Sequence, residues 1–252
     1  RARLLFWPET AITTALNHDA ETQRLIGSVL GEYDLLFAGD IGAMPGPDRR
    51  PRATTNSVFV IGAGGEIRGR YDKIHLVPFG EYLPMPNLLG TLGLSRLIAG
   101  SAPFVAGSGA RSLQIDGLTA SIDICYEIIF AGAVVDPRIR PQFLFNSSND
   151  AWFGHAGPPQ HLAQARMRAI EEGLPVIRAT TNGISAVIRA DGSIAASLPW
   201  RTAGRIETVL PGQAPATFFS ARGNIPALTV SLLAFGALSL TGRTAPWSPR
   251  SR

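Results

Sequence analysis

The sequence predicts an α/β domain in which strands and helices alternate. Apolar runs typical of buried strands recur along the chain, at residues 34–38, 56–62, 118–124 and 143–146. Stretches with apolar residues at helical spacing stand between them, at 19–31 and 160–173. No internal repeat or low-complexity linker divides the 252 residues, so we expect one large layered domain.

The first half of the chain opens with a short apolar run at 4–7, which ends at Pro8-Glu9. The helix expected at 19–31 carries Leu25, Ile26, Val29 and Leu30. After the strand at 34–38, the runs 56–62 and 67–71 flank Gly64-Gly65 and predict a hairpin. The runs 112–115 and 118–124 predict a second hairpin, which turns at Asp116-Gly117.

The second half begins at Cys125, directly after the strand at 118–124. The segment 128–135 that follows is expected to start a helix. A strand at 143–146, a helix at 160–173 and strands at 175–181 and 184–190 come next, with a turn at Asp191-Gly192.

The last apolar run, residues 225–240, holds 16 residues without a charge. A membrane-spanning helix usually needs about 20, so length alone fits a buried core helix equally well. The run follows a stretch rich in proline and glycine at 211–215, and it precedes a tail with Arg243, Arg250, Arg252 and no acid. Because basic segments remain cytoplasmic, this order favours a membrane span with the main domain on the opposite side.

Composition sets further limits. Only 17% of the residues are charged, against about 25% in average chains, and the mean hydropathy is positive. The net charge of +4 comes from scattered arginines that form no nucleic-acid-binding stripe. The chain starts without methionine or signal peptide, as if a strand were already under way, so we expect further sequence upstream.

Cys125 is the single cysteine, so it forms no disulfide within the chain. A lone cysteine is often a small buried hydrophobic residue. Its place where a strand passes into a helix favours a second interpretation, a nucleophile. Backbone N–H groups there lower a thiol pKa and stabilise an oxyanion, so we expect a reactive thiol.

Glu9 and Lys73 also lie just past strand ends. Partial burial of Glu9 beside Trp7 and Pro8 would raise its pKa toward the range of a general base, although a cap for the next helix is the commoner role. Lys73 is the only lysine in a chain that otherwise uses arginine. A compact ammonium neutralises an oxyanion in a tight site where guanidinium does not fit, and the alternative is a surface lysine.

A histidine site is the main alternative at the level of single residues. His75 or His161 could form a thiolate dyad with Cys125, although no protease signature surrounds the cysteine. The four histidines show no metal-ligand spacing, so we expect no metal.

Four motifs in order resemble the nitrilase superfamily: Trp7-Pro8-Glu9, the stretch 71–82, Cys125-Tyr126-Glu127 and the stretch 149–154. The two long stretches, with Gln160-His161 and residues 166–171 and 178–185 downstream, resemble its apolipoprotein N-acyltransferase branch. The resemblance covers about residues 5–196 and the final apolar helix.

The resemblance implies an αββα sandwich and a catalytic triad of Glu9 as base, Lys73 as oxyanion partner and Cys125 as nucleophile. It also implies supporting roles for Glu81, Tyr126 and Glu127. The expected reaction moves an acyl chain from a phospholipid to the α-amine of a diacylglyceryl-cysteine on an apolipoprotein, through a thioester and without a cofactor. Family members of this branch carry a membrane domain upstream, which this chain lacks.

A leucine-rich segment after Glu81 holds Leu83, Leu88, Leu89, Leu92 and Leu94. Core packing explains it as well as a mobile lid that touches the bilayer and admits an acyl chain. Its prolines and glycines favour a loop over a regular helix. Trp152 and Phe153 are further candidates for substrate or lid contacts.

We therefore expect a catalytic domain over residues 1–215, a transmembrane helix over 224–241 and a basic tail over 242–252. The expected setting is the bacterial inner membrane, with the domain facing the periplasm as a monomer and no nucleic-acid partner. One alternative is a soluble-type carbon–nitrogen hydrolase that passes the acyl group to water. Another is a non-catalytic binding protein on an inherited fold, which an intact triad disfavours.

Overall fold

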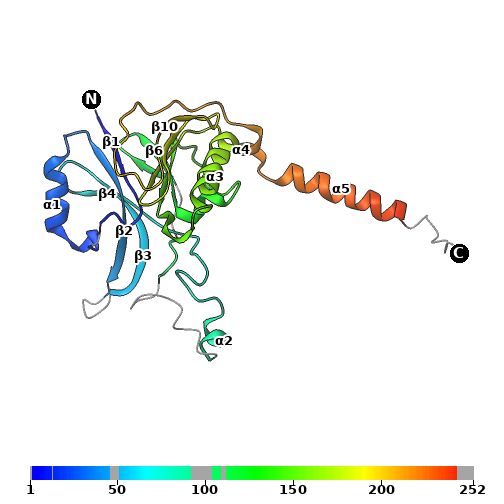
Figure 1. The fold of residues 1–252 in the computed structure, drawn as a ribbon, viewed down its shortest axis with the longest axis horizontal. Helices are drawn as coiled ribbons and strands as arrows, with labels where there is room; N and C mark the ends of the chain where they lie inside the picture. The colour runs from blue at the N-terminus through cyan, green and yellow to red at the C-terminus, as the bar shows by residue number, and fades with distance from the viewer. Residues whose placement is uncertain (1, 13, 46–50, 92–103, 109–111, 243–252) are drawn as a thin grey trace, which may run out of the picture.

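Two β-sheets face each other, with a helix on the outer face of each, in a computed structural model of the chain (Figure 1). The structure describes residues 2–12, 14–45, 51–91, 104–108 and 112–242. Helix α1 (Ala20–Val29) lies outside the first sheet and α3 (Gly157–Glu172) outside the second. The expected αββα layers are thus present.

The first sheet has the strand order β1-β2-β3-β4. Its strands are β1 (Leu4–Trp7), β2 (Leu35–Pro45), β3 (Pro51–Ile61) and β4 (Ile67–Asp72). Strand β1 is parallel to β2, and β2, β3 and β4 are mutually antiparallel neighbours. The carboxyl ends of β1 and β4 therefore lie at the same edge of the sheet.

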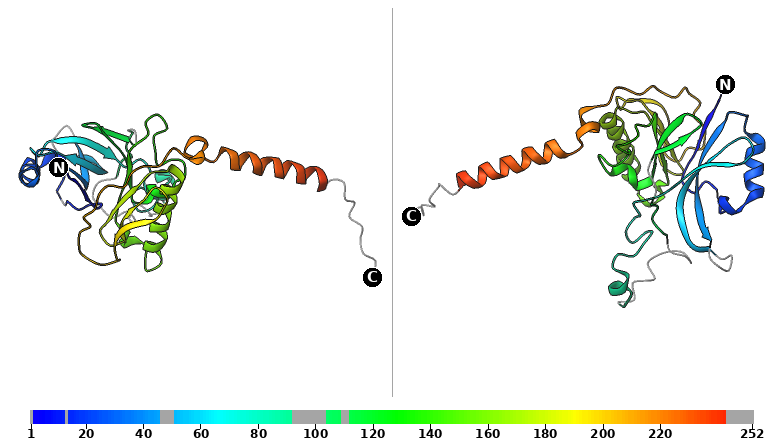
Figure 2. Two further views of the ribbon diagram at one scale, coloured as in Figure 1. Left: turned by 90° about the horizontal axis from the view of Figure 1, so that it is seen from above. Right: turned by 180° about the vertical axis from the view of Figure 1, so that it is seen from behind.

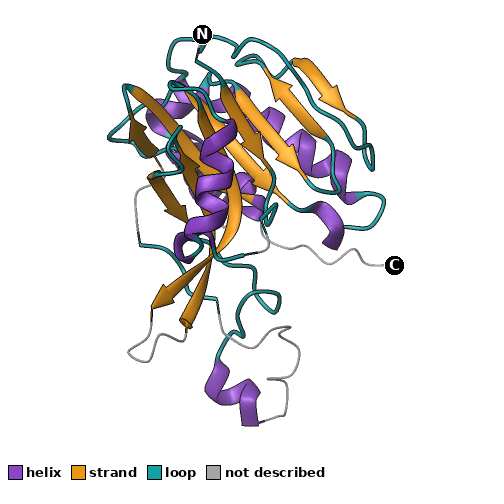
Figure 3. Cartoon of the chain, turned by 90° about the vertical axis from the view of Figure 1, so that its left-hand side faces the viewer, coloured by secondary structure: helices purple, strands orange, loops and turns teal. Residues whose placement is uncertain are grey.

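The second sheet has the order β10-β9-β8-β7-β6-β5. Its strands are β5 (Ser112–Ile115), β6 (Leu118–Ile124), β7 (Phe143–Ser148), β8 (Val176–Thr180), β9 (Ser185–Ile188) and β10 (Ile194–Leu198). The central strands β6, β7 and β8 run parallel, with antiparallel neighbours on both sides (Figure 3). The carboxyl ends of the three parallel strands share one edge.

Period-two alternation in the central strands builds the layers. Phe37 of β2 and Val60 of β3 join Ile122 and Phe145 of the second sheet in the core between the sheets. Their chain neighbours face the other way, so Leu36 packs on the α1 side. A third cluster joins the outer face of the second sheet to α3.

The remaining helices are short, apart from the last. They are the 3₁₀ helices η1 (Leu16–His18), η3 (Cys125–Ile129) and η4 (Asp150–Trp152), and the α-helices α2 (Pro86–Thr91), α4 (Phe218–Arg222) and α5 (Ile225–Gly242). Asp19 caps α1 by accepting a hydrogen bond from the Thr22 N–H, and Gly173, with a φ of 64°, ends α3.

Several predictions about elements were wrong. No regular helix forms over residues 128–135, because the chain leaves η3 after one turn and bends at Gly132, whose φ is 71°. Residues 86–91, expected as loop, form α2, whose first residue is a proline that helices accept at this position. Strand β10 and helix α4 were not predicted.

Helix α5 projects away from the two sheets (Figure 2). Its large apolar side chains are exposed along the helix, including Leu232, Leu233 and Phe235. None of the helices among the described residues combines the length and the hydropathy that a membrane crossing requires. The predicted transmembrane helix is therefore not confirmed. The arginines of the expected basic tail lie outside the described residues.

Candidate active site

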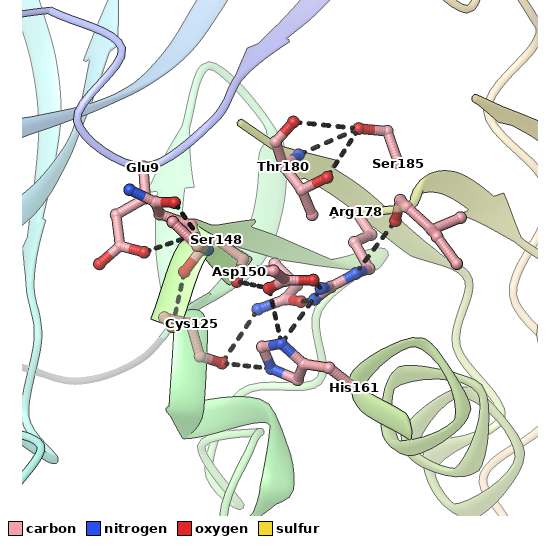
Figure 4. Close-up of polar contacts among 12 residues, drawn as sticks. Glu9, Cys125, Ser148, Asp150, His161, Arg178, Thr180 and Ser185 are labelled. Carbon is pink, nitrogen blue, oxygen red and sulfur yellow. Dashed lines mark hydrogen bonds and ion pairs between the residues drawn. The ribbon is translucent and has the colours of Figure 1, made fainter. Parts of the chain in front are cut away.

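The carboxyl ends of strands from both sheets meet at one place. Glu9 follows β1, Lys73 follows β4 directly, Cys125 follows β6 and Asn149 follows β7. The backbone N–H of Asn149 donates a hydrogen bond to Glu9 Oε2 at 2.7 Å, which joins the two sheets at this edge (Figure 4). Ligand and catalytic sites commonly lie at this edge of α/β sheets.

Glu9 is held from both sides and is 7% exposed. Its second oxygen, Oε1, accepts a hydrogen bond of 2.6 Å from Asn56 Nδ2 on β3. Gly39 lets the chain approach closely here, since a Cβ on it would lie 2.5 Å from the Pro8 carbonyl oxygen and 2.7 Å from Glu9 Cα. The sequence therefore leaves the Glu9 carboxylate little freedom.

Lys73 is 1% exposed and makes an ion pair with Glu81. Its Nζ donates a hydrogen bond of 2.8 Å to Glu81 Oε1, which also accepts from Asn56 Nδ2 at 3.1 Å. Glu81 Oε2 accepts from the Val77 N–H at 2.7 Å. Glu81 thus holds the ammonium, and Asn56 bridges the carboxylates of Glu9 and Glu81.

Cys125 is 6% exposed and stands between β6 and η3, as the strand-to-helix prediction required. Its φ is +51°, in the left-handed region that residues other than glycine rarely adopt. Its Sγ lies 3.9 Å from the carbonyl oxygen of Asn149. Such a sharp turn at a strand end presents the side chain at the edge of the sheet.

The charges of Glu9 and Lys73 both act on Cys125. Burial, with the Glu9 carboxylate nearby, raises the pKa of the Cys125 thiol to about 12, against the opposing effect of Lys73. The expectation of a lowered thiol pKa was wrong, because burial outweighs the backbone dipoles here. Cys125 is consequently a thiol at neutral pH, and its attack requires a base.

Glu9 has the properties of that base. Burial raises the pKa of Glu9 above its ordinary value, and the charge of Lys73 and the hydrogen bond from Asn56 offset part of the rise. Burial opposes the charge on Lys73, but the carboxylates of Glu9 and Glu81 outweigh it and raise the pKa of Lys73. The site therefore holds a carboxylate, an ammonium and a thiol at neutral pH.

Glu127 is fully buried and ties β6 to the segment after β4. Its Oε1 accepts hydrogen bonds from the N–H groups of Ile74 at 2.9 Å and His75 at 3.0 Å. Its Oε2 accepts from the Ile124 N–H at 2.9 Å, and the Tyr71 hydroxyl donates to both oxygens. The carboxylate therefore fixes the backbone on which Lys73 and Cys125 stand. Tyr126 packs its ring edge-on against Phe130, with centroids 4.9 Å apart.

Neither histidine is placed for the thiolate dyad considered above. His161 Nε2 lies 3.1 Å from the backbone carbonyl oxygen of Cys125, so its ring contacts the main chain of the cysteine. The ring of His75 stacks near Phe130, and its Nδ1 lies 3.9 Å from Glu127 Oε1.

Large apolar side chains stand exposed on the segments that follow Lys73 and Asn149. We call the following set the apolar rim: Phe79, Tyr82, Met85, Leu88, Trp152 and Phe153, exposed between 38% and 78%. Leu83, also in the predicted lid, is buried. The side chain of Leu89, and the residues Leu92 and Leu94, lie outside the described part of the chain.

The sequence profile of the carbon-nitrogen hydrolase family matches residues 1–211, which include all three triad residues and both sheets. The chain belongs to the carbon-nitrogen hydrolase family. Solved structures of two hydrolases share the fold. An amidase from Nesterenkonia sp. has a TM-score of 0.55 at 17% identity, over 79% of this chain and 73% of its own. A carbon-nitrogen hydrolase from Helicobacter pylori has a TM-score of 0.55 at 15% identity, over 78% of this chain and 73% of its own.

Curated relatives of this carbon-nitrogen hydrolase chain carry the name apolipoprotein N-acyltransferase. The protein from Bradyrhizobium diazoefficiens is 40% identical over 236 residues, which are 92% of this chain and 44% of the relative. The protein from Sinorhizobium fredii is 41% identical over 248 residues, which are 96% of this chain and 46% of the relative. The chain thus spans less than half the length of these relatives.

Four buried polar residues of the site received no role from the sequence: Asn56, Asp150, His161 as a backbone contact, and Arg178. Asn56 lies in the middle of an apolar strand, where a fully buried amide signals a specific partner. Asp150 and Arg178 belong to motifs of the carbon-nitrogen hydrolase resemblance. Only their contacts, formed between β7, α3 and β8, reveal what they do.

Proposed function

We propose that this chain is the catalytic part of an apolipoprotein N-acyltransferase. It would transfer a fatty acyl chain from a phospholipid to the α-amine of the diacylglyceryl-cysteine that begins an apolipoprotein. The observation that carries the proposal is the convergence of Glu9, Lys73 and Cys125 at one buried edge of both sheets. The similarity to named acyltransferases supports the choice of substrates.

The first step forms a thioester. Glu9 accepts the proton of the Cys125 thiol as the sulfur attacks the ester carbonyl carbon of the phospholipid. The Lys73 ammonium neutralises the oxyanion that develops. The carbon–oxygen bond of the ester then breaks, and the lysophospholipid leaves with the proton that Glu9 returns.

The second step forms an amide. The α-amine of the apolipoprotein attacks the thioester carbon, and Glu9 accepts a proton from the amine nitrogen. Lys73 stabilises the second oxyanion in the same position. The carbon–sulfur bond breaks, the Cys125 sulfur regains a proton, and the N-acylated lipoprotein leaves.

The apolar rim supports a lipid donor. A hydrolase acting on small amides has little need of six exposed apolar side chains beside its site, whereas an acyl chain must be taken from a bilayer. The two rim residues Trp152 and Phe153 come immediately after Asn149 and Asp150, so a lipid that contacts them is close to the site. We propose that the rim and the leucine-rich segment after Glu81 receive the acyl chain.

Helix α5 supports a location at a membrane. Its exposed apolar side chains occur around the helix and include Leu228, Val230 and Leu240. The membrane span expected over residues 224–241 remains a proposal, with the catalytic domain on the periplasmic side of the inner membrane and the tail at 242–252 in the cytoplasm. Holding the enzyme there would raise its effective concentration toward two membrane-bound substrates.

The decisive experiment uses the complete protein in detergent, with a phospholipid carrying a labelled acyl chain and a diacylglyceryl peptide. We expect label on the peptide amine, and without the peptide we expect label on Cys125 as a hydroxylamine-sensitive thioester. Cys125→Ser should abolish both, since a hydroxyl is far less ionised than a thiol. Label released only as free fatty acid, or no transfer with hydrolysis of small amides, would instead assign a hydrolase.

A further inference from the structure

A buried polar network contacts the backbone of Cys125, and the proposed reaction steps make no use of it. It consists of Asp150, His161 and Arg178, each at most 3% exposed. His161 comes from α3 and Arg178 from β8, while Asp150 follows β7 (Figure 4). Three separate elements thus supply charged or titratable groups to one buried point, which is costly unless they serve a purpose.

Asp150 is the centre of this network. Its Oδ1 lies 2.9 Å from His161 Nδ1 and accepts a hydrogen bond of 2.8 Å from the Ser148 hydroxyl. Its Oδ2 accepts from Arg178 Nη2 at 2.6 Å. Burial works against the ionised carboxylate, but His161 and Arg178 outweigh it and lower the pKa of Asp150 to about 2. A fully ionised Asp150 therefore fixes the His161 ring in one orientation.

The other side of the His161 ring reaches the nucleophile. Nε2 lies 3.1 Å from the backbone carbonyl oxygen of Cys125. Because a carbonyl oxygen only accepts hydrogen bonds, Nε2 carries a proton and donates it. Asn146, which Arg178 holds by its side-chain oxygen, donates a second and longer hydrogen bond of 3.4 Å to the same carbonyl. The network thus ends on the main chain of Cys125, and its carbonyl is the point of contact.

This contact controls the direction of two groups. Cys125 adopts a φ of +51°, a strained backbone conformation that persists only where the surroundings hold it. Its carbonyl oxygen and the N–H of Tyr126 belong to one planar trans peptide, so they point in opposite directions. Holding the oxygen toward α3 turns the Tyr126 N–H away from α3 and fixes the backbone that carries Sγ.

We propose that His161, held by Asp150 and Arg178, is a positioning residue for the nucleophile of this enzyme. By holding the Cys125 carbonyl, it keeps Sγ within reach of Glu9 and keeps the Cys125–Tyr126 peptide in the orientation that acyl transfer requires. The proposal rests on the proposed function, because it assumes acyl transfer at Cys125. The Asp150 and Arg178 side chains act through His161 and touch no reacting atom.

Two amide variants separate this role from simple packing. The Nε2 of a glutamine stands where Nε2 of His161 stands and still reaches the Cys125 carbonyl. The amide of an asparagine stands nearer Nδ1, so it reaches Asp150 and not Cys125. We expect His161→Asn to lower kcat about 10²-fold with little change in KM, as a small displacement of a reacting group does, and His161→Gln to restore most of the loss. Ser121→Ala is the matched control, because Ser121 is buried on β6 and donates to the Val134 carbonyl oxygen at 2.6 Å. It should lower the melting temperature without lowering kcat.

The rate at which iodoacetamide alkylates Cys125 in the complete protein gives a readout independent of the substrates. It should fall in His161→Asn and recover in His161→Gln. Equal kcat and alkylation rates in wild type and both variants, or equal losses in both variants, would overturn the positioning role. If alkylation separates the two variants while the wild-type protein transfers no acyl group, the proposed function fails and the positioning role stands.

Discussion

The Lys73 ammonium donates a hydrogen bond of 2.8 Å to Oε1 of Glu81, and both groups lie at the edge of a buried site. The same Glu81 oxygen accepts a hydrogen bond from Asn56, which also donates to Glu9. Glu81 therefore fixes Lys73 directly and is linked through one amide to the proposed base. An oxyanion partner that is held in advance needs no rearrangement when charge develops.

Glu81→Gln should lower kcat by about 10- to 100-fold, because it removes a charge-assisted hydrogen bond worth roughly 1.5–3 kcal/mol. Steady-state acyl transfer in detergent measures the effect. Glu66→Gln is the matched control, since Glu66 pairs with Arg68 at the surface. Wild-type rates in Glu81→Gln would mean that Lys73 keeps its place without this carboxylate.

Lys73→Arg should be nearly as damaging as Lys73→Ala, with a loss of about 10²–10³ in kcat. Lys73 is 1% exposed, so the site has no room for a planar guanidinium in the place of a point charge. Arg70→Lys, a charge-conserving change on the same strand, should leave kcat unaltered. If Lys73→Arg retains wild-type turnover, any cation suffices and the geometric argument is wrong.

The pH profile of kcat/KM should have its acidic limb above the ordinary range of a glutamate. The pKa of Glu9 is raised by burial, and the base must be ionised to accept the thiol proton. Activity is therefore lost as pH falls through the raised pKa. The pKa of Lys73 is also raised, so loss of its charge occurs only at strongly alkaline pH. An acidic limb at or below the usual glutamate pKa of about 4.3 would exclude Glu9 as the base.

Much of the fold follows from apolar spacing. Period-two alternation in residues such as Phe37 and Leu36 assigns opposite faces of one strand, and glycine-containing turns mark the hairpins. The short elements are less predictable. The one-turn η3 after Cys125 and the six-residue α2 depend on local packing, which no periodicity of this length reports.

The sequence indicated Glu9, Lys73 and Cys125 because each lies past a strand end. It did not indicate that burial would raise the Cys125 pKa, since that effect depends on how much of the two sheets covers the sulfur. It also gave His161 the wrong contact. One histidine on an amphipathic helix can face a sulfur or a carbonyl, and only the placement of α3 against η3 decides between them.

Trp152→Ser should raise KM for phospholipid in vesicles several-fold and leave KM for a short-chain soluble ester unchanged. The side chain is 78% exposed beside the site, so we expect it to contact lipid and not the reacting ester. Tyr33→Ser is the matched control, since Tyr33 is 71% exposed on the turn between α1 and β2. Equal changes in KM for both donors would contradict a lipid-contacting rim.

The proposed topology predicts the behaviour of two reporter fusions in cells that produce the complete protein. A reporter active only in the cytoplasm should give signal when fused after Arg252, because the basic tail is expected to remain on that side. The same reporter fused after Arg222, ahead of α5, should give none, since the catalytic domain is expected in the periplasm. A periplasm-specific reporter should show the opposite pattern at the two positions. Identical signals at both positions would mean that α5 does not cross the bilayer, and the exposed apolar helix would then lie along its surface or against another protein segment.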